Sequence, residues 1–136
     1  MNKLLIYTDG GARRNPGPAA IGIVIYDEKH SQILKNIGIA IGETTNNQAE
    51  YKALITALYE AIKLGAEEVV CNLDSELVVK QLQGKYKIKE EGLKPLASEV
   101  LRLTSKFTKI EFHHIPREKN KLADKLVNKA LDDAGF

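Results

Sequence analysis

The stretch LLIYTDGG, residues 4–11, joins a short apolar run to a carboxylate, Asp9, and a pair of glycines. Such a run is typical of a buried β-strand, and the glycines indicate a turn directly after it. A second apolar run, residues 69–73, is also followed by a carboxylate, Asp74. If the two strands are parallel neighbours, both carboxylates emerge at the same edge of the sheet, where open α/β sheets bind their ligands.

The segments around these two strands predict an α/β fold. Residues 19–26 and 33–41 alternate in the manner of strands and form an antiparallel meander with residues 4–9. Helices are expected over residues 46–64, 75–83, 93–107 and 121–134, and a further strand over 109–116. The order βββαβααβα predicts a five-stranded mixed sheet, antiparallel on one side and parallel on the other, flanked by helices.

Composition sets broad limits on the class of protein. The chain of 136 residues, 43% apolar and 28% charged, fits a single domain over residues 1–136. Its net charge of +2 means that any nucleic acid would have to be bound by a localised surface. There is no signal-peptide pattern and no apolar run of the ~18 residues that a membrane helix needs. Because Cys71 is the only cysteine, the chain excludes an internal disulfide, and these features together favour the cytoplasm.

Two further carboxylates add to the pair at the strand ends. Glu50 precedes Ala53 and Leu54 by three and four positions, so it shares the apolar face of its helix. A carboxylate on that face is costly unless it is paired or binds a metal. Asp124 lies in the first turn of the last helix. Oxygen ligands without clustered cysteine or histidine favour magnesium or manganese over zinc.

Each acid also has a purely structural interpretation. Asp9 could form a turn with its glycines, and Asp74 with Ser75 could cap a helix. Asp124 could interact favourably with a helix N-terminus, and Glu50 could belong to a buried salt bridge. These interpretations stay open for each residue alone, but they do not explain why the predicted fold would bring four acids to one sheet edge.

Four motifs taken together resemble type 1 ribonuclease H. They are YTDGG (7–11) with NPGP (15–18), TTNNQAE (44–50), DS (74–75) and REKNKLAD (117–124), in that family's order and approximate spacing. A lone TDG or DS would mean nothing, but this match spans essentially the whole chain. The resemblance implies a ribonuclease H-like fold and an endonuclease that cuts the RNA strand of an RNA–DNA hybrid, leaving 5′-phosphate and 3′-hydroxyl ends.

By the same resemblance, Asp9, Glu50, Asp74 and Asp124 are catalytic, metal-binding carboxylates. Asp9 would bridge two Mg²⁺ ions, with Glu50 and Asp74 on one ion and Asp124 on the other, and Mn²⁺ could substitute. Two such ions can activate a water and stabilise the leaving oxygen of an in-line displacement at phosphorus.

The resemblance also implies substrate contacts. The asparagines would meet the minor groove of the hybrid, where 2′-hydroxyls are displayed, although helix capping is an alternative role for Asn46 and Asn47. Thr45 would contribute to a pocket for a DNA-strand phosphate. The backbone around Gly10 would approach the RNA closely, which would explain its glycines. The expected substrate-binding residues are Gly10, Gly11, Ala12, Asn15, Thr45, Asn46, Asn47 and Ser75.

The chain departs from better-known members of the family in two places. The connector over residues 85–92 leaves no room for the lysine-rich substrate-binding handle of longer members. Many members also carry a histidine in the loop before the last acid, where this chain has Arg117. Arg117 is an auxiliary catalytic candidate that offers fixed charge and a donor fork, not a proton shuttle. Strand alternation would turn at least one of His113 and His114 inward as a structural residue.

Two alternatives come from other classes. A catalytically silent nucleic-acid-binding module on the same fold would be expected to have lost at least one acid, and all four are present. A transposase or junction-resolvase core would share the fold, and only cleavage assays separate it from a ribonuclease H. We expect a monomeric ribonuclease H that binds RNA–DNA hybrid and has no membrane partner.

Overall fold

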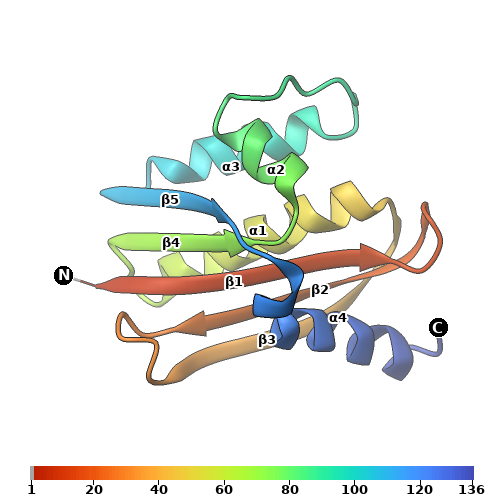
Figure 1. Ribbon diagram of the computed structural model, residues 1–136, viewed down its shortest axis with the longest axis horizontal. Helices are drawn as coiled ribbons and strands as arrows, with labels where there is room; N and C mark the ends of the chain where they lie inside the picture. The colour runs from red at the N-terminus through yellow and green to blue at the C-terminus, as the bar shows by residue number, and fades with distance from the viewer. Residues whose placement is uncertain (1) are drawn as a thin grey trace.

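Strand β1 lies at the centre of a five-stranded sheet in the computed structural model, which describes residues 2–136 (Figure 1). The strands run in the order β3-β2-β1-β4-β5. Their bounds are β1 Lys3–Ala12, β2 Gly17–Tyr26, β3 Ile33–Thr44, β4 Glu68–Leu73 and β5 Lys109–His114. β2 pairs antiparallel with β1 and β3, whereas β4 pairs in parallel with β1 and β5. The predicted mixed sheet is therefore confirmed.

Helices cover both faces of this sheet. They are α1 (Asn46–Lys63), α2 (Glu76–Leu82), α3 (Lys94–Thr104) and α4 (Lys121–Asp133), with a 3₁₀ turn over Arg117–Lys119. α1 packs on β1 and β2 with α3 beside it, and α4 covers β1, β2 and β3 from the other side (Figure 1). The two faces of β2 show this division, because Ile21 and Ile23 join the main core with α1 while Ala20 packs under Val127 of α4.

The helices that flank the acidic residues have well-defined starts. Thr45 caps α1 by accepting a hydrogen bond from the Gln48 backbone N–H, and the Gln48 side chain returns to the Thr45 backbone. This reciprocal capping box identifies Thr45, rather than Asn46 or Asn47, as the cap. Ser75 caps α2 through the Val78 N–H. The side chain of Asp74 is therefore not used as the cap.

Glycines set the height of α4 above the sheet. A Cβ at Gly22 would overlap the carbonyl oxygen of Ala123, and one at Gly38 would lie 2.8 Å from the carbonyl oxygen of Leu126. With no side chain at these two positions, the helix backbone can approach the strands closely. Asp124, which follows Ala123, is thereby brought down towards β1.

The structure corrects two expectations. β1 does not turn at its glycines but stays paired with β2 as far as Ala12, so Asp9 lies within the strand. His113 and His114 are both exposed, with 51% and 39% of their side chains accessible, so neither is turned inward. They lie at the C-terminal end of β5, an edge strand in which even Ile110 and Phe112, which pack against the core, are only partly buried.

Candidate metal centre

The register of the two central parallel strands brings Asp9 and Asp74 together. Pairing of β1 with β4 ends at Thr8 and Leu73, so the two acids are the next residues on adjacent strands. β4 stops there while β1 continues beside β2. The prediction that both carboxylates emerge at one edge of the parallel sheet is confirmed.

Glu50 reaches the same place from α1. The helix touches β1 so closely that a Cβ on Gly10 would overlap the Ala49 carbonyl and lie 2.6 Å from the backbone nitrogen of Glu50. The Glu50 carboxylate is buried and accepts a hydrogen bond from the Gly10 N–H. Among residues 2–136 it forms no salt bridge, so the alternative of a buried ion pair is wrong. Contact with α1 explains why residue 10 is glycine.

The three carboxylates are crowded, and among the described residues none of them forms a salt bridge. One oxygen from each of Asp9, Glu50 and Asp74 lies within 4.8 Å of the others. Burial, helped by the charge of Asp74, raises the pKa of Asp9 to about 7. Burial and the charge of Asp9 raise the pKa of Glu50 well above its ordinary value. Clustered carboxylate oxygens are the ligands that hard divalent cations prefer, and the cluster fits such an ion.

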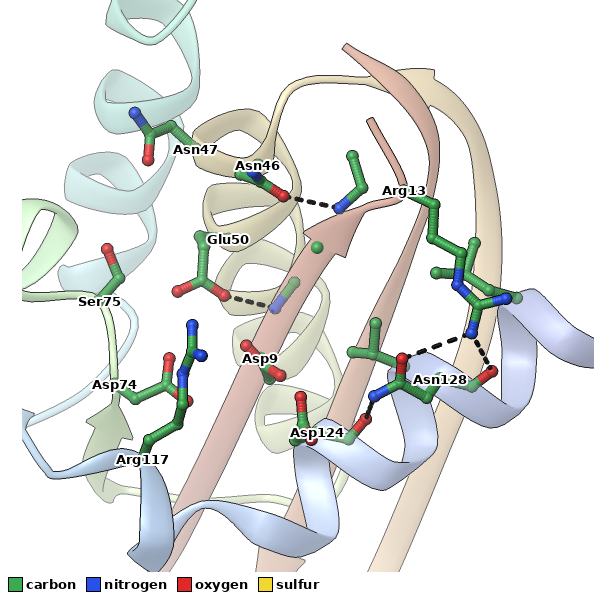
Figure 2. Close-up of a pocket in the computed structure, with 15 residues that line it drawn as sticks. Asp9, Arg13, Asn46, Asn47, Glu50, Asp74, Ser75, Arg117, Asp124 and Asn128 are labelled. Carbon is green, nitrogen blue, oxygen red and sulfur yellow. Dashed lines mark hydrogen bonds between the residues drawn. The ribbon is translucent and has the colours of Figure 1, made fainter. Parts of the chain in front are cut away.

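Asp124 completes the site from the opposite face of the sheet. It lines, with the other three acids, a cavity of about 350 Å³. Figure 2 shows Asp9 between Glu50 and Asp124, with Asp74 to one side. The charge of Asp124 also contributes to the raised pKa of Asp9. The four predicted acids therefore share one cavity, and three of them form its most crowded part.

The raised pKa of Asp9 predicts a pH-dependent stability of the metal-free protein. Between the ordinary value of 3.8 and about 7, the folded state keeps a proton that the unfolded state has released. The contribution of Asp9 to the free energy of unfolding therefore falls as pH rises through this window. Asp9→Asn should be about as stable as the wild type near pH 4 and increasingly more stable towards pH 7. Thermal unfolding in EDTA checks this, and a Tm difference that does not grow with pH would contradict it.

Most of the expected substrate-binding residues border the same cavity. Asn15 and Thr45 do not line it. The Asn15 side-chain oxygen accepts a hydrogen bond from the Asn46 N–H at 3.0 Å, and Thr45 serves as the helix cap. The expected residues that line the cavity are Gly10, Gly11, Ala12, Asn46, Asn47, Ser75 and, among the catalytic candidates, Arg117.

Three polar residues near the acids were not predicted as site residues. Arg13 lines the cavity and pairs with Asp132 at 2.8 Å, which ties the β1–β2 turn to the end of α4. Asn128, also in the cavity lining, donates to the Asp124 carbonyl oxygen at 3.1 Å. Asn120 donates to the Asp74 carboxylate at 3.2 Å. For the two asparagines the signal available in the sequence was their spacing: Asn128 follows Asp124 by four residues on α4, and Asn120 precedes it by four at the N-cap of that helix.

The strand order and the acidic cavity together define a ribonuclease H-like protein. Residues 7–130 match the family described as reverse transcriptase-like. The ribonuclease HI of Halobacterium salinarum is 41% identical over 94% of this chain and 64% of its own length. The chain belongs to the ribonuclease H family.

Solved structures agree with this assignment. The N-terminal RNase H domain of Rv2228c from Mycobacterium tuberculosis superposes with a TM-score of 0.92 at 45% identity, covering 96% of this chain and 99% of that one. LC11-RNase H1, isolated from compost, has been solved in complex with an RNA/DNA hybrid. In that complex it gives a TM-score of 0.91 at 50% identity, covering 96% and 98% of the two chains. The chain spans only 36% of the length of the bifunctional protein Rv2228c.

Within residues 2–136 the structure has no helix that combines the length and apolar character needed to cross a membrane.

Proposed function

We propose that this domain is a ribonuclease H, an endonuclease that hydrolyses the RNA strand of RNA–DNA hybrids with two Mg²⁺ ions, for which Mn²⁺ can substitute. The observation that carries the proposal is the cluster of Asp9, the buried Glu50 and the half-buried Asp74, with the exposed Asp124 across the same cavity. Membership of the ribonuclease H family and the hybrid-bound LC11-RNase H1 support it. We further propose that the domain acts as a monomer in the cytoplasm.

The position of each acid determines which of the two ions it would bind. Asp9 lies between the others and would bridge both ions, with Glu50 and Asp74 on one side and Asp124 on the other. Ions held by these carboxylates would supply positive charge at the scissile phosphate and would lower the pKa of the attacking water. As the new oxygen–phosphorus bond forms, the bond to the 3′-oxygen breaks, which leaves a 5′-phosphate and a 3′-hydroxyl.

Asn46, which lines the cavity, and Asn15, which is hydrogen-bonded to it, support recognition of a minor groove. The Asn46 side-chain oxygen accepts from the Ala12 N–H at 2.8 Å, and the Asn15 oxygen accepts from the Asn46 N–H. With their acceptors engaged by the protein, both amide groups can present their N–H donors outwards. Minor-groove base edges and 2′-hydroxyls supply matching acceptors. Asn47 is also at the cavity, and Thr45 would approach a DNA-strand phosphate nearby.

A cleavage assay on matched substrates tests the function directly. Purified protein would be incubated with end-labelled RNA–DNA hybrid, double-stranded RNA and double-stranded DNA, each with Mg²⁺ or with EDTA. We expect magnesium-dependent cuts in the RNA of the hybrid alone. Binding of the hybrid without cleavage would instead identify a silent binding module. Cleavage of DNA would identify a transposase or resolvase core.

Arg117 provides a prediction about the auxiliary group. Its side chain is directed towards the acids from the 3₁₀ turn (Figure 2), where its charge can contact a phosphate oxygen. Arg117→Ala should slow single-turnover cleavage by roughly 100- to 1000-fold with the metal requirement nearly unchanged, as expected for loss of one donor to the developing charge. Arg117→Lys should recover part of the rate because lysine keeps the charge but loses the planar fork.

The matched control uses the exposed histidine nearest in sequence. His114→Ala should leave the rate close to that of the wild type, because His114 does not line the cavity. A large loss in a folded His114→Ala protein, with normal cleavage by Arg117→Ala, would mean that the auxiliary group is wrongly assigned.

A further inference from the structure

Asn120 connects the three segments that carry Asp9, Asp74 and Asp124. It lies between the 3₁₀ turn and α4 and is only 2% exposed. Its side-chain amide donates to the carbonyl oxygen of Thr8 at 2.8 Å and to Oδ2 of Asp74 at 3.2 Å. Its own carbonyl oxygen accepts from the Asp124 N–H at 3.1 Å. One residue therefore contacts β1 directly before Asp9, the Asp74 carboxylate and the first turn of α4.

The partners of Asn120 determine which way its amide group points. Both nearby side-chain contacts, the Thr8 carbonyl and the Asp74 carboxylate, are acceptors, so the rotated amide would place oxygen against oxygen. The remaining oxygen, Oδ1, is buried and has no hydrogen-bond partner among the described residues. Leaving a buried acceptor unpaired is unfavourable for stability. A buried polar atom without a partner calls for an explanation, and the amide orientation that leaves Oδ1 unpaired is the one that directs the donors at Thr8 and Asp74.

We propose that Asn120 is a positioning residue that holds the Asp74 carboxylate in its metal-binding orientation and keeps the first turn of α4 next to β1. The proposal rests on the proposed function, because it assumes that Asp74 binds a divalent cation. A hydrogen bond to Oδ2 of Asp74 restricts the rotation of the carboxylate and leaves its other oxygen available to bind a cation. Asn120 itself does not line the acidic cavity, so it acts through Asp74.

Asn72 supplies a matched control for a purely structural role. It is also a buried asparagine, and its amide donates to a β1 carbonyl, that of Ile6, at 3.2 Å. It lies two residues before Asp74 but makes no hydrogen bond to a carboxylate. Asn72→Ala and Asn120→Ala both remove an amide bond to β1, and only the second removes a bond to a proposed metal ligand.

The test measures metal binding without substrate. Mn²⁺ would be titrated calorimetrically into wild type, Asn120→Ala and Asn72→Ala, with folding checked by thermal unfolding. We expect Asn120→Ala to bind Mn²⁺ roughly 10- to 100-fold more weakly, as is typical when a group supporting a metal ligand is lost. The Mg²⁺ concentration for half-maximal cleavage should rise by a similar factor, and excess Mg²⁺ should restore part of the rate. Asn72→Ala should keep wild-type Mn²⁺ affinity even if its Tm falls.

Wild-type Mn²⁺ affinity in Asn120→Ala, or an equal loss in Asn72→Ala, would overturn the proposal. If Asn120→Ala does not fold, Asn120→Ser replaces it, since the shorter side chain cannot reach both partners and should show the same loss. Failure of the proposed function is a separate result, in which the wild type itself neither binds Mn²⁺ nor cleaves the hybrid.

Discussion

Asp9→Asn is expected to reduce the single-turnover rate of hybrid cleavage by about 10³-fold or more while leaving the protein folded. Asp9 lies between the other acids and is the proposed bridging ligand. Metal ions contribute several kcal/mol of transition-state stabilisation, and each ~1.4 kcal/mol corresponds to a factor of ten in rate. The neutral amide keeps the size of the side chain but removes the charge that would hold two cations together.

An acid outside the cavity gives the control for this experiment. Asp133 is exposed at the end of α4 and pairs with Lys129 at 2.8 Å. Asp133→Asn makes the same chemical change and should leave cleavage near the wild-type rate. Appreciable magnesium-dependent cleavage by pure Asp9→Asn protein would show that the metal site has been assigned to the wrong carboxylates.

Gly10→Ala is expected to destabilise the protein by about 3 kcal/mol and to impair cleavage in whatever fraction folds. A Cβ at Gly10 would overlap the backbone carbonyl of Ala49, so α1 and β1 would have to move apart. Overpacking of a well-packed core typically costs about 1–3 kcal/mol, and backbone neighbours give way less readily than flexible side chains. The same shift would displace Glu50, whose carboxylate accepts from the Gly10 N–H.

The variant Gly11→Ala is the control, because it distinguishes loss of packing from a clash with bound substrate. A Cβ there would meet Val127 at 3.8 Å and Asn46 at 3.9 Å, which are ordinary contact distances. Gly11→Ala should therefore unfold at a denaturant midpoint near that of the wild type. If residue 11 also lies against the RNA, the Gly11→Ala protein should bind the hybrid more weakly than the wild type without a loss of stability. A Gly10→Ala protein as stable as the wild type would refute the packing explanation.

Much of the fold could be predicted because its signals are local. Alternation over β2 and the helical spacing of Ala53, Leu54 and Ala57 are each contained in a short segment. Carboxylates at the ends of two apolar runs also identified the sheet edge, since parallel neighbours must end together. The inward position of Glu50 followed from the helical period, and its burial confirms that prediction.

Other features could not be predicted because they depend on partners distant in the chain. The glycines after Asp9 suggested a turn, yet β2 keeps pairing with β1 to Ala12, so long-range hydrogen bonds outweighed local preference. Alternation alone predicted that at least one of His113 and His114 would be buried. Both are exposed at the C-terminal end of β5, an edge strand whose apolar residues are themselves only partly buried.

The sequence by itself determined the order of the elements, the four acids and the edge at which they meet. Those properties follow from periodicity and from the short segments that carry the family's motifs. Only the tertiary structure decided how closely the acids approach and what surrounds them. The absence of a side chain at Gly10 lets α1 pack closely on β1, and its absence at Gly22 lets α4 pack closely on β2. Asn120 donates a hydrogen bond to Asp74, which is 46 residues away in the chain. Such contacts depend on packing distances between separate elements, which no local pattern of residues encodes.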